Sequence, residues 1–282
     1  TNNGTVDLVV QSNTIDLIVQ GGLTNQGNIN AKGRTIDVTG NIFNKAVQEN
    51  TSTNPNSVAV SGGSIDLDGG SISAATFVAE GGSLIDLGTG GNANFETARG
   101  EYVNTNISFD SATEEDPGAS QIEVSGGTLT ITDELERQTN ARFIAGTSST
   151  VIFDKPDPAN KSNLTGNFTS PNQLANVTLT GQTTLDPDSQ TEIGGVLTVN
   201  SDADYGESES NRAPGVTYNG TNFDIQGNFF ADVVRFNRNS GNITNNPVTT
   251  VVGKVFAEVV ITNGVQAELG GSFIINGLLS LN

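Results

Sequence analysis

The chain of 282 residues repeats its own sequence. The segment Gly33–Phe43 returns, with substitutions, as Gly220–Phe230, and the longer segment Leu174–Asn200 returns without gaps as Phe256–Asn282. Both repeats alternate short apolar stretches with Gly and Asn, which is the pattern of strands joined by turns. Units of this size cannot bury an apolar face alone and have to stack on their neighbours, so the sequence predicts a repeat architecture.

A shorter motif, Thr or Ser followed by an aliphatic residue, an acid and an aliphatic residue, gives the period of the stack. Alternation with a period of two places the aliphatic residues on one face of a strand and the acids on the other. The spacing is 21 residues from Ile15 to Ile36 and 20 from Ile65 to Ile85, which is about one turn of a β-solenoid, hereafter a coil. We therefore predict an all-β parallel β-helix with protruding acidic loops; an antiparallel sandwich with similar turns is the alternative. The copies of the motif are Thr5–Leu8, Thr14–Leu17, Thr35–Val38 and Ser64–Leu67, with variants Leu84–Leu87 and Gln121–Val124.

Gly-Asn pairs followed by an apolar residue mark the corners between strands. Gly is expected there because it adopts positive φ, and Asn because it tolerates that conformation. Asn residues that stack between coils are expected to form amide ladders. With 34% apolar residues and no Trp, the core is expected to consist mostly of Val, Ile and Leu. The pairs begin at Gly27, Gly40, Gly91, Gly166, Gly227 and Gly241, and Gly-Gly pairs at seven further places, 194–195 among them, mark other corners.

The repeats change character near residue 145. Residues 1–145 carry Gly-Gly and Ile-Asp-Leu units and residues 146–282 the longer 27-residue unit, and we expect one continuous solenoid. Asp133–Arg142 is the one short helix that we predict, with Asp133 as its N-cap. Three polar stretches are predicted to protrude as loops: 44–57, 110–119 and 201–215.

Composition excludes several classes of function. The absence of His and Cys rules out His-based triads, thiol nucleophiles and the usual zinc sites. A formal charge of −19 repels nucleic acid and anionic membrane surfaces, and no stretch approaches the roughly 20 apolar residues of a spanning helix, so neither nucleic-acid binding nor membrane insertion is expected. The lack of Cys agrees with a bacterial surface protein. Because position 1 is Thr, we expect either a removed leader or a piece of a larger chain.

Carboxylates are the residues left for chemistry. Asp66 paired with Asp68, or with Asp86 one coil later, is the strongest candidate for the paired acids of a β-helical polysaccharide-degrading enzyme. One acid per repeat, alternating with aliphatic residues, is better explained as the solvent face of a strand. We therefore predict that the chain is not an enzyme.

Two acidic segments place oxygen ligands at alternate positions, as calcium-binding loops do, although neither has the full twelve-residue EF-hand pattern. The sequence thus predicts Ca²⁺ as the one candidate cofactor. The candidate ligands are Asp186, Asp188, Asp202, Asp204, Glu207 and Glu209.

Several of these strands resemble known repeats. Thr150–Asp154, Leu174–Leu179 and Gly195–Asn200 resemble the solenoid repeats of large secreted surface proteins of Bacteroidota, and Leu23–Asn30 is similar to the repeats of filamentous-haemagglutinin-type adhesins. The resemblance implies a right-handed parallel β-helix, export to the cell surface, and a role in adhesion, surface layers or filaments.

Apolar strands stand at both ends of the sequence. Solenoids need polar caps, because an open coil exposes unpaired backbone groups and apolar side chains. We therefore predict an extracellular structural protein, a subunit or segment of a filament, sheath or adhesin stalk, whose partners are further copies added head to tail or the flanking repeats of a longer chain. A glycan-binding adhesin segment is the alternative. The predicted contact residues are Val6, Leu8, Val10, Ile15, Leu17, Val19, Ile274, Leu278, Leu279 and Leu281.

Overall fold

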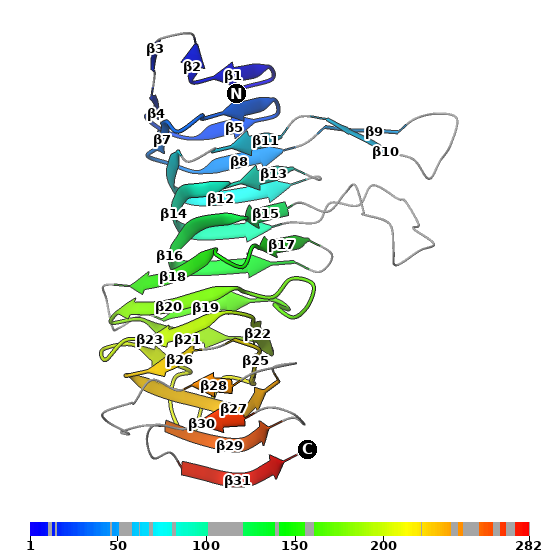
Figure 1. The fold of residues 1–282 in the computed structure, drawn as a ribbon. Coiled ribbons are helices and arrows are strands. Elements are labelled where there is room, and N and C mark those ends of the chain that lie inside the picture. The colour runs from blue at the N-terminus through cyan, green and yellow to red at the C-terminus, as the bar shows by residue number, and fades with distance from the viewer. Residues whose placement is uncertain are drawn as a thin grey trace. The chain divides into compact units, whose positions relative to one another are not determined.

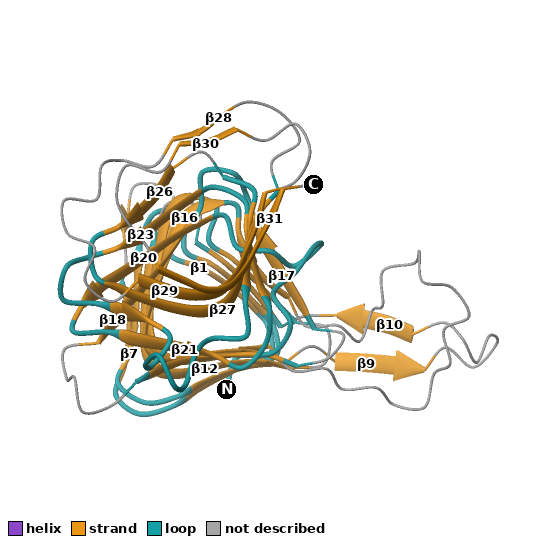
Figure 2. Ribbon diagram, turned by 90° about the horizontal axis from the view of Figure 1, so that it is seen from below, coloured by secondary structure: helices purple, strands orange, loops and turns teal. Residues whose placement is uncertain are grey.

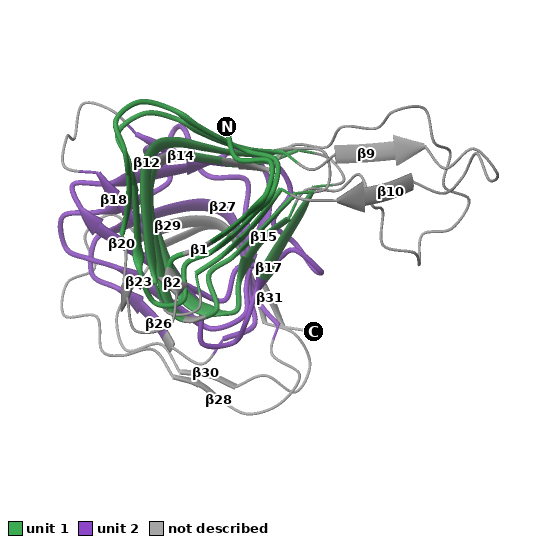
Figure 3. Ribbon diagram, turned by 90° about the horizontal axis from the view of Figure 1, so that it is seen from above, with its two compact units in different colours: residues 1–129, 136–144 green, residues 130–135, 145–282 purple. Residues whose placement is uncertain are grey.

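The chain divides into two compact units (Figure 3). Unit 1 comprises Thr1–Leu129 and Glu136–Ile144, and unit 2 comprises Thr130–Leu135 and Ala145–Asn282. The structure, a computed structural model, describes residues 1–10, 13–14, 16–45, 47–50, 58–61, 63–67, 70–80, 83–100, 121–138, 141–155, 161–220, 222–237, 242–244, 254–261, 266–268 and 274–281.

All regular secondary structure in the described residues is β-strand (Figure 1). The earlier strands are β1 (Thr5–Asp7), β2 (Val9–Val10), β3 (Asn13–Thr14), β4 (Leu17–Val19), β5 (Leu23–Asn25), β6 (Asn28–Asn30), β7 (Thr35–Val38), β8 (Ile42–Lys45), β9 (Val47–Asn50), β10 (Val58–Ser61), β11 (Ser64–Asp66), β12 (Ser71–Glu80), β13 (Leu84–Asp86), β14 (Thr89–Gly100), β15 (Gln121–Val124), β16 (Gly126–Arg137) and β17 (Arg142–Ala145). The later strands are β18 (Thr150–Lys155), β19 (Ser162–Thr165), β20 (Asn176–Gly181), β21 (Thr184–Pro187), β22 (Thr191–Ile193), β23 (Val196–Val199), β24 (Asp204–Tyr205), β25 (Val216–Tyr218), β26 (Asn222–Ile225), β27 (Asn228–Phe236), β28 (Asn242–Thr244), β29 (Lys254–Ile261), β30 (Gln266–Glu268) and β31 (Ile274–Leu281).

Unit 1 is a parallel β-solenoid, and the predicted fold class is confirmed. One coil runs through β6, β7 and β8, and each of these strands pairs in parallel with strands of the coils before and after it. β12 is long enough to pair with β7 through its first residues and with β8 through its last ones, so it turns a corner without a break. The antiparallel pairs among the described strands are two small hairpins, β2–β3 and β9–β10, and the second of these leaves the side of the coil (Figure 2).

Unit 2 has the same construction. One parallel ladder runs through β18, β20, β23 and β26, a second through β21, β24 and the start of β27, and a third through β22, β25 and the end of β27. The last described strands continue these ladders, since β29 pairs with β27 and β31 pairs with β29. The antiparallel sandwich alternative is therefore wrong.

The first sequence repeat corresponds to the same pair of strands in both units. Gly33–Phe43 contains β7 and the start of β8, and Gly220–Phe230 contains β26 and the start of β27. In each copy the aliphatic or aromatic residues of the first strand are buried, as Ile36 and Phe223 illustrate with exposures of 0% and 5%. The alternation read from the sequence therefore describes the inward and outward faces correctly.

The predicted coil period is confirmed at one place and shifted at another. Ile65 lies in register with Ile85, as the 20-residue spacing predicts. Ile36, however, pairs with Leu17, and Ile15 lies outside the described residues. The motif at Thr35–Val38 also belongs to a different ladder from the one at Ser64–Leu67, since β7 pairs with β4 and β11 pairs with β6.

The second repeat preserves a strand pairing rather than a position on the coil. In the first copy Val177 pairs with Leu197, and in the second copy Val259 pairs with Leu279. The first pair belongs to the ladder of β20 and β23, whereas the second belongs to the ladder that contains β25 and the end of β27. Sequence similarity thus gives the coil length, and the corners decide which side of the coil a strand joins.

The core of unit 1 is mostly aliphatic, as predicted, although it also buries Phe143 and the stacked pair Phe77 and Phe95, whereas part of the core of unit 2 is an aromatic cluster. Tyr205 stacks on Phe229 with ring centroids 4.6 Å apart, and Phe223 meets the edge of Phe229 at 5.3 Å. Tyr218 and Phe236 extend this cluster. Because these residues come from successive coils, their rings meet only after the chain has stacked.

The corner glycines fall into two groups: Gly21, Gly63 and Gly166 have the predicted positive φ, whereas others are required for a different reason. At the Gly-Asn pairs, positive φ is found at Gly166 but not at Gly27 or Gly227. A Cβ atom at either of these two positions would lie 1.9 Å from a carbonyl oxygen of the preceding coil, that of Gly4 or of Ala203. Close approach of two coils, and not left-handed backbone, is what excludes a side chain there.

An amide ladder exists, built from Asn residues other than those of the Gly-Asn pairs. Asn2 donates to Asn25 Oδ1 at 2.9 Å, and Asn25 donates to Asn44 Oδ1 at 2.8 Å. Asn44 in turn donates to the carbonyl of Leu84 at 2.9 Å, and Ser83 donates to the carbonyl of Asn44. Asn25 and Asn44 are fully buried, so this ladder satisfies polar groups inside unit 1.

Two other local predictions are wrong. Asp133–Arg142 is not a helix, because residues up to Arg137 extend β16 and bury Leu135 in the core. The stretch 201–215 is not only a loop, because Tyr205 and Ala213 are fully buried and pair with neighbouring coils. Of the stretch 44–57, residues 44–45 belong to β8 and 47–50 to β9, and residues 110–119 lie outside the described residues. In these places the burial that stacking provides outweighs the local secondary-structure propensity.

Candidate functional site

Two strands carry the large exposed apolar side chains of the described residues. Ile18 of β4 is 68% exposed and Leu279 of β31 is 51% exposed. Leu279 belongs to a column that includes Val216 and Val234, both fully buried. Leu279 differs from these residues because its strand, β31, pairs with one described strand alone, β29. A side chain on an inward-facing column stays partly exposed when its strand is paired on one side alone.

The edge of unit 1 is arranged similarly. β1 pairs with β6 and β4 pairs with β7, and among the described strands neither has a second partner. Val6, Leu17 and Val19 are half-buried, whereas Ile29 and Ile36, their counterparts in the next coil, are almost fully buried. Among the described strands, β1 and β4 thus pair on one side alone, and each has partly exposed apolar side chains.

The other predicted contact residues are buried, are paired within a hairpin, or lie outside the described residues and side chains. Leu8 is 3% exposed, and Val10 pairs with Asn13 in the hairpin β2–β3. Ile15 is outside the described residues. The strands that hold Val10, Ile274, Leu278 and Leu281 are described, but the side chains of these residues are not.

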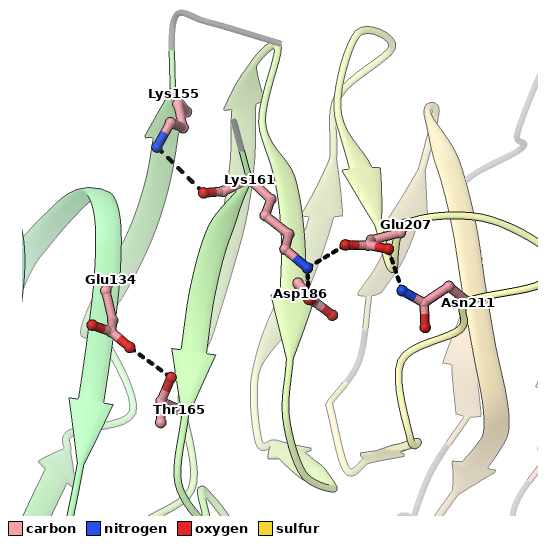
Figure 4. Close-up of polar contacts among 7 residues, drawn as sticks. All are labelled: Glu134, Lys155, Lys161, Thr165, Asp186, Glu207 and Asn211. Atoms are coloured by element: carbon pink, nitrogen blue, oxygen red, sulfur yellow. Dashed lines mark hydrogen bonds and ion pairs between the residues drawn. The ribbon is translucent and has the colours of Figure 1, made fainter. Parts of the chain in front are cut away.

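A second candidate site is a polar cluster in unit 2 (Figure 4). Lys161, just before β19, donates to Asp186 Oδ2 at 2.5 Å and also bonds to the carboxylate of Glu207. Asn211 donates to the other oxygen of Glu207. Two of the predicted calcium ligands, from successive coils, therefore converge on the ammonium group of a lysine.

Both charged partners are stabilised in their ionised forms. The hydrogen bond to Asp186, followed by that to Glu207, raises the pKa of Lys161 above its ordinary value. The hydrogen bond from Lys161, followed by that from Asn211, lowers the pKa of Glu207. The cluster therefore links three successive coils through charged hydrogen bonds.

Replacing Lys161 by Met is expected to raise the pKa of Glu207 toward the ordinary value of about 4.3. In the wild type the lowered pKa of Glu207 contributes stability above the unfolded-state pKa, and this contribution is lost as the pH falls through the folded-state pKa. The side chains of Lys161 and Glu207 are 42% and 30% exposed, so the effect on folding free energy near pH 7 should stay below about 1 kcal/mol.

The measurement is a carboxyl NMR titration of the wild type and both lysine variants. Lys155→Met is the matched control, because it removes the same charge from a lysine bonded to Asp133. Equal shifts of Glu207 in both variants would mean that general charge, and not this contact, sets its pKa.

The remaining predicted calcium ligands do not join the cluster. Asp188 accepts from the Gly166 amide at 3.0 Å, and Asp204 accepts from Asn228 at 2.7 Å. Asp202 and Glu209 are exposed. Among the described residues, no three acidic side chains come close enough to hold a metal ion. Calcium binding stays a prediction from the sequence.

The acids considered for catalysis do lie side by side. Asp66 is in register with Asp86, and Asp86 with Glu123 of the following coil. Asp86 Oδ1 accepts from the Gly88 amide at 2.9 Å, and Glu123 accepts from Ser125 at 2.7 Å. Asp68 is outside the described residues. The column forms part of an outward face of unit 1.

Sequence reasoning missed Lys161, because it treated the acidic segments as clusters without a counter-ion. The signal was a lysine placed about one coil before Asp186.

Comparison with known protein families, with curated proteins and with solved structures finds no match to this chain. In the described part of the chain, no helix has the length and hydropathy needed to cross a membrane.

Proposed function

We propose that this chain is an extracellular structural protein of a bacterial surface, a subunit or segment of a filament, sheath or adhesin stalk that extends head to tail through its open β-solenoid edges. The observation that carries the proposal is Leu279, a core-column residue that is 51% exposed on a strand with one open side. A second copy of the chain is the proposed occupant of that side.

Three features support this reading over a ligand-binding role. Inner strands such as β23 and β27 are paired in parallel on both sides by strands of the same chain, so another coil of this kind is the natural complement of an open edge. The acidic segment around Glu207 has its own counter-ion in Lys161, which leaves less reason for a glycan site there. The resemblance to surface adhesin repeats points to the same location and class.

The test is negative-stain electron microscopy and sedimentation of the purified 282-residue chain. Long filaments that grow with protein concentration are expected, and Leu279→Glu should abolish them by placing a charge on the apolar edge. Gln182→Glu, which adds the same charge at an exposed turn, should assemble like the wild type. If the wild type remains as single particles at all concentrations, flanking repeats of a longer chain or another protein cover the edge, and self-assembly is ruled out.

Assembly is expected to increase with salt. Each copy carries a formal charge of −19, so copies repel one another, and this repulsion is screened over about 10 Å at 0.1 M ionic strength. Pairing through backbone groups and apolar side chains is little affected by screening. Sedimentation between about 0.05 and 0.5 M NaCl should therefore show a rising filament fraction. A falling fraction would indicate an interface held by ion pairs instead.

A further inference from the structure

Two ladders, one in each unit, occupy corresponding sides of the coil. In unit 1 the chain passes from β6 through β7 to β8 and then to β11, which pairs with β6. In unit 2 it passes from β25 through β26 to the start of β27, and the end of β27 pairs with β25. Because β7 and β26 belong to the same sequence repeat, the ladder of β1 and β6 corresponds to that of β25, β29 and the second half of β31.

The open strands at the ends of these ladders have matching patterns. In β31, Leu279 continues the column of Val234, and Leu281 pairs with Ile261 of β29. In unit 1, Val6 is in register with Ile29, and Leu8 is 3% exposed and bonds through its amide to the carbonyl of Asn30. Each edge therefore has two apolar core positions two residues apart, of which Val6 and Leu279 are partly exposed, while Leu8 is already covered by its own chain.

One register aligns the two core positions of β1 with the two core positions of β31. It places Val6 on Leu279 and Leu8 on Leu281, and it brings Asp7 beside Ser280. A shift by one residue would set core positions against outward ones, because side chains alternate between the faces of a strand. A shift by two residues would leave two of the four apolar positions, one on each strand, without an apolar partner.

We propose that β1 of one copy pairs in parallel with the second half of β31 of another, with Val6 on Leu279 and Asp7 beside Ser280. This inference rests on the proposed head-to-tail assembly and specifies its interface. A strand pair of this kind adds a parallel edge strand, for which backbone hydrogen bonds supply affinity and the apolar positions supply register.

Disulfide trapping tests the register, and the chain suits it because it contains no Cys. Asp7→Cys and Ser280→Cys are made as separate variants, each is checked for wild-type assembly, and the two are mixed under mild oxidation. Residues directly opposite on paired strands lie within the roughly 4.4–6.8 Å Cα separation that a disulfide requires. A cross-linked dimer of one copy of each variant is the expected product.

The matched control replaces Asp7→Cys by Thr5→Cys, which lies two residues away on the same outward side of β1. This mixture should give a several-fold lower yield of cross-linked dimer. Filaments without the Asp7–Ser280 cross-link, or with equal yields from both mixtures, would overturn the register while leaving the proposed function intact. Absence of assembly in the wild type would overturn both.

Discussion

Gly227→Ala is expected to lower the free energy of unfolding of unit 2 by about 3 kcal/mol. A Cβ atom at position 227 would lie 1.9 Å from the carbonyl oxygen of Ala203 and 2.4 Å from that of Asn200. Both obstacles are backbone atoms of the preceding coil, so they cannot swing aside as a side chain would. The two coils have to separate at this corner, which weakens the pairing of β24 with β27.

Gly194→Ala is the matched control for this prediction. The nearest atom to a Cβ there is the carbonyl oxygen of Leu174 at 3.7 Å, an ordinary contact, and the backbone is not left-handed. The change should therefore alter stability by no more than about 0.5 kcal/mol. Denaturant unfolding followed by circular dichroism compares the two variants. Similar losses from both would show that glycine content, and not close approach of coils, limits these corners.

Phe229→Ala is expected to cost about 3–5 kcal/mol. Phe229 is fully buried, stacks on Tyr205 at 4.6 Å and meets Phe223 at 5.3 Å. Truncation removes both ring contacts and leaves a cavity in the aromatic cluster, which neighbouring coils cannot fill because backbone ladders fix their spacing. Phe229→Leu keeps most of the apolar volume and should cost about 1.5 kcal/mol.

Near-ultraviolet circular dichroism and denaturant unfolding check this prediction together. The chain has 3 Tyr and no Trp, so Tyr side chains dominate the near-ultraviolet signal. Phe229→Ala should reduce this signal through Tyr205 before unfolding begins, and Phe229→Leu should change it less. A variant with wild-type stability would mean that the Tyr205–Phe229 stack adds nothing to the core.

Several features of the fold could be predicted because they depend on local alternation. The strand at Ser64–Asp66 and the 20-residue step from Ile65 to Ile85 follow directly from apolar and acidic residues at a period of two. The corner positions follow from Gly. The reason for Gly227 could not be predicted, because the atom that excludes a side chain belongs to another coil.

The candidate sites, too, could be predicted from the sequence only in part. The sequence alone points to apolar strands near both ends of the chain, and the exposure of Leu279 agrees with this. It also points to Asp186 and Glu207 as binding residues, but their common partner, Lys161, becomes visible only when three successive coils are in register.

The sequence by itself determined that this chain is a parallel stack of short strands, because alternation, coil length and turn residues are all local properties of the chain. The tertiary structure decided which side of the coil each strand joins, which asparagines form a ladder, and that Asp133–Arg137 is strand. These depend on contacts between residues about one coil apart, whose energies exceed local preferences once the backbones pair. That stacking brings Lys161 into contact with Asp186 and Glu207. It likewise brings Tyr205 onto Phe229.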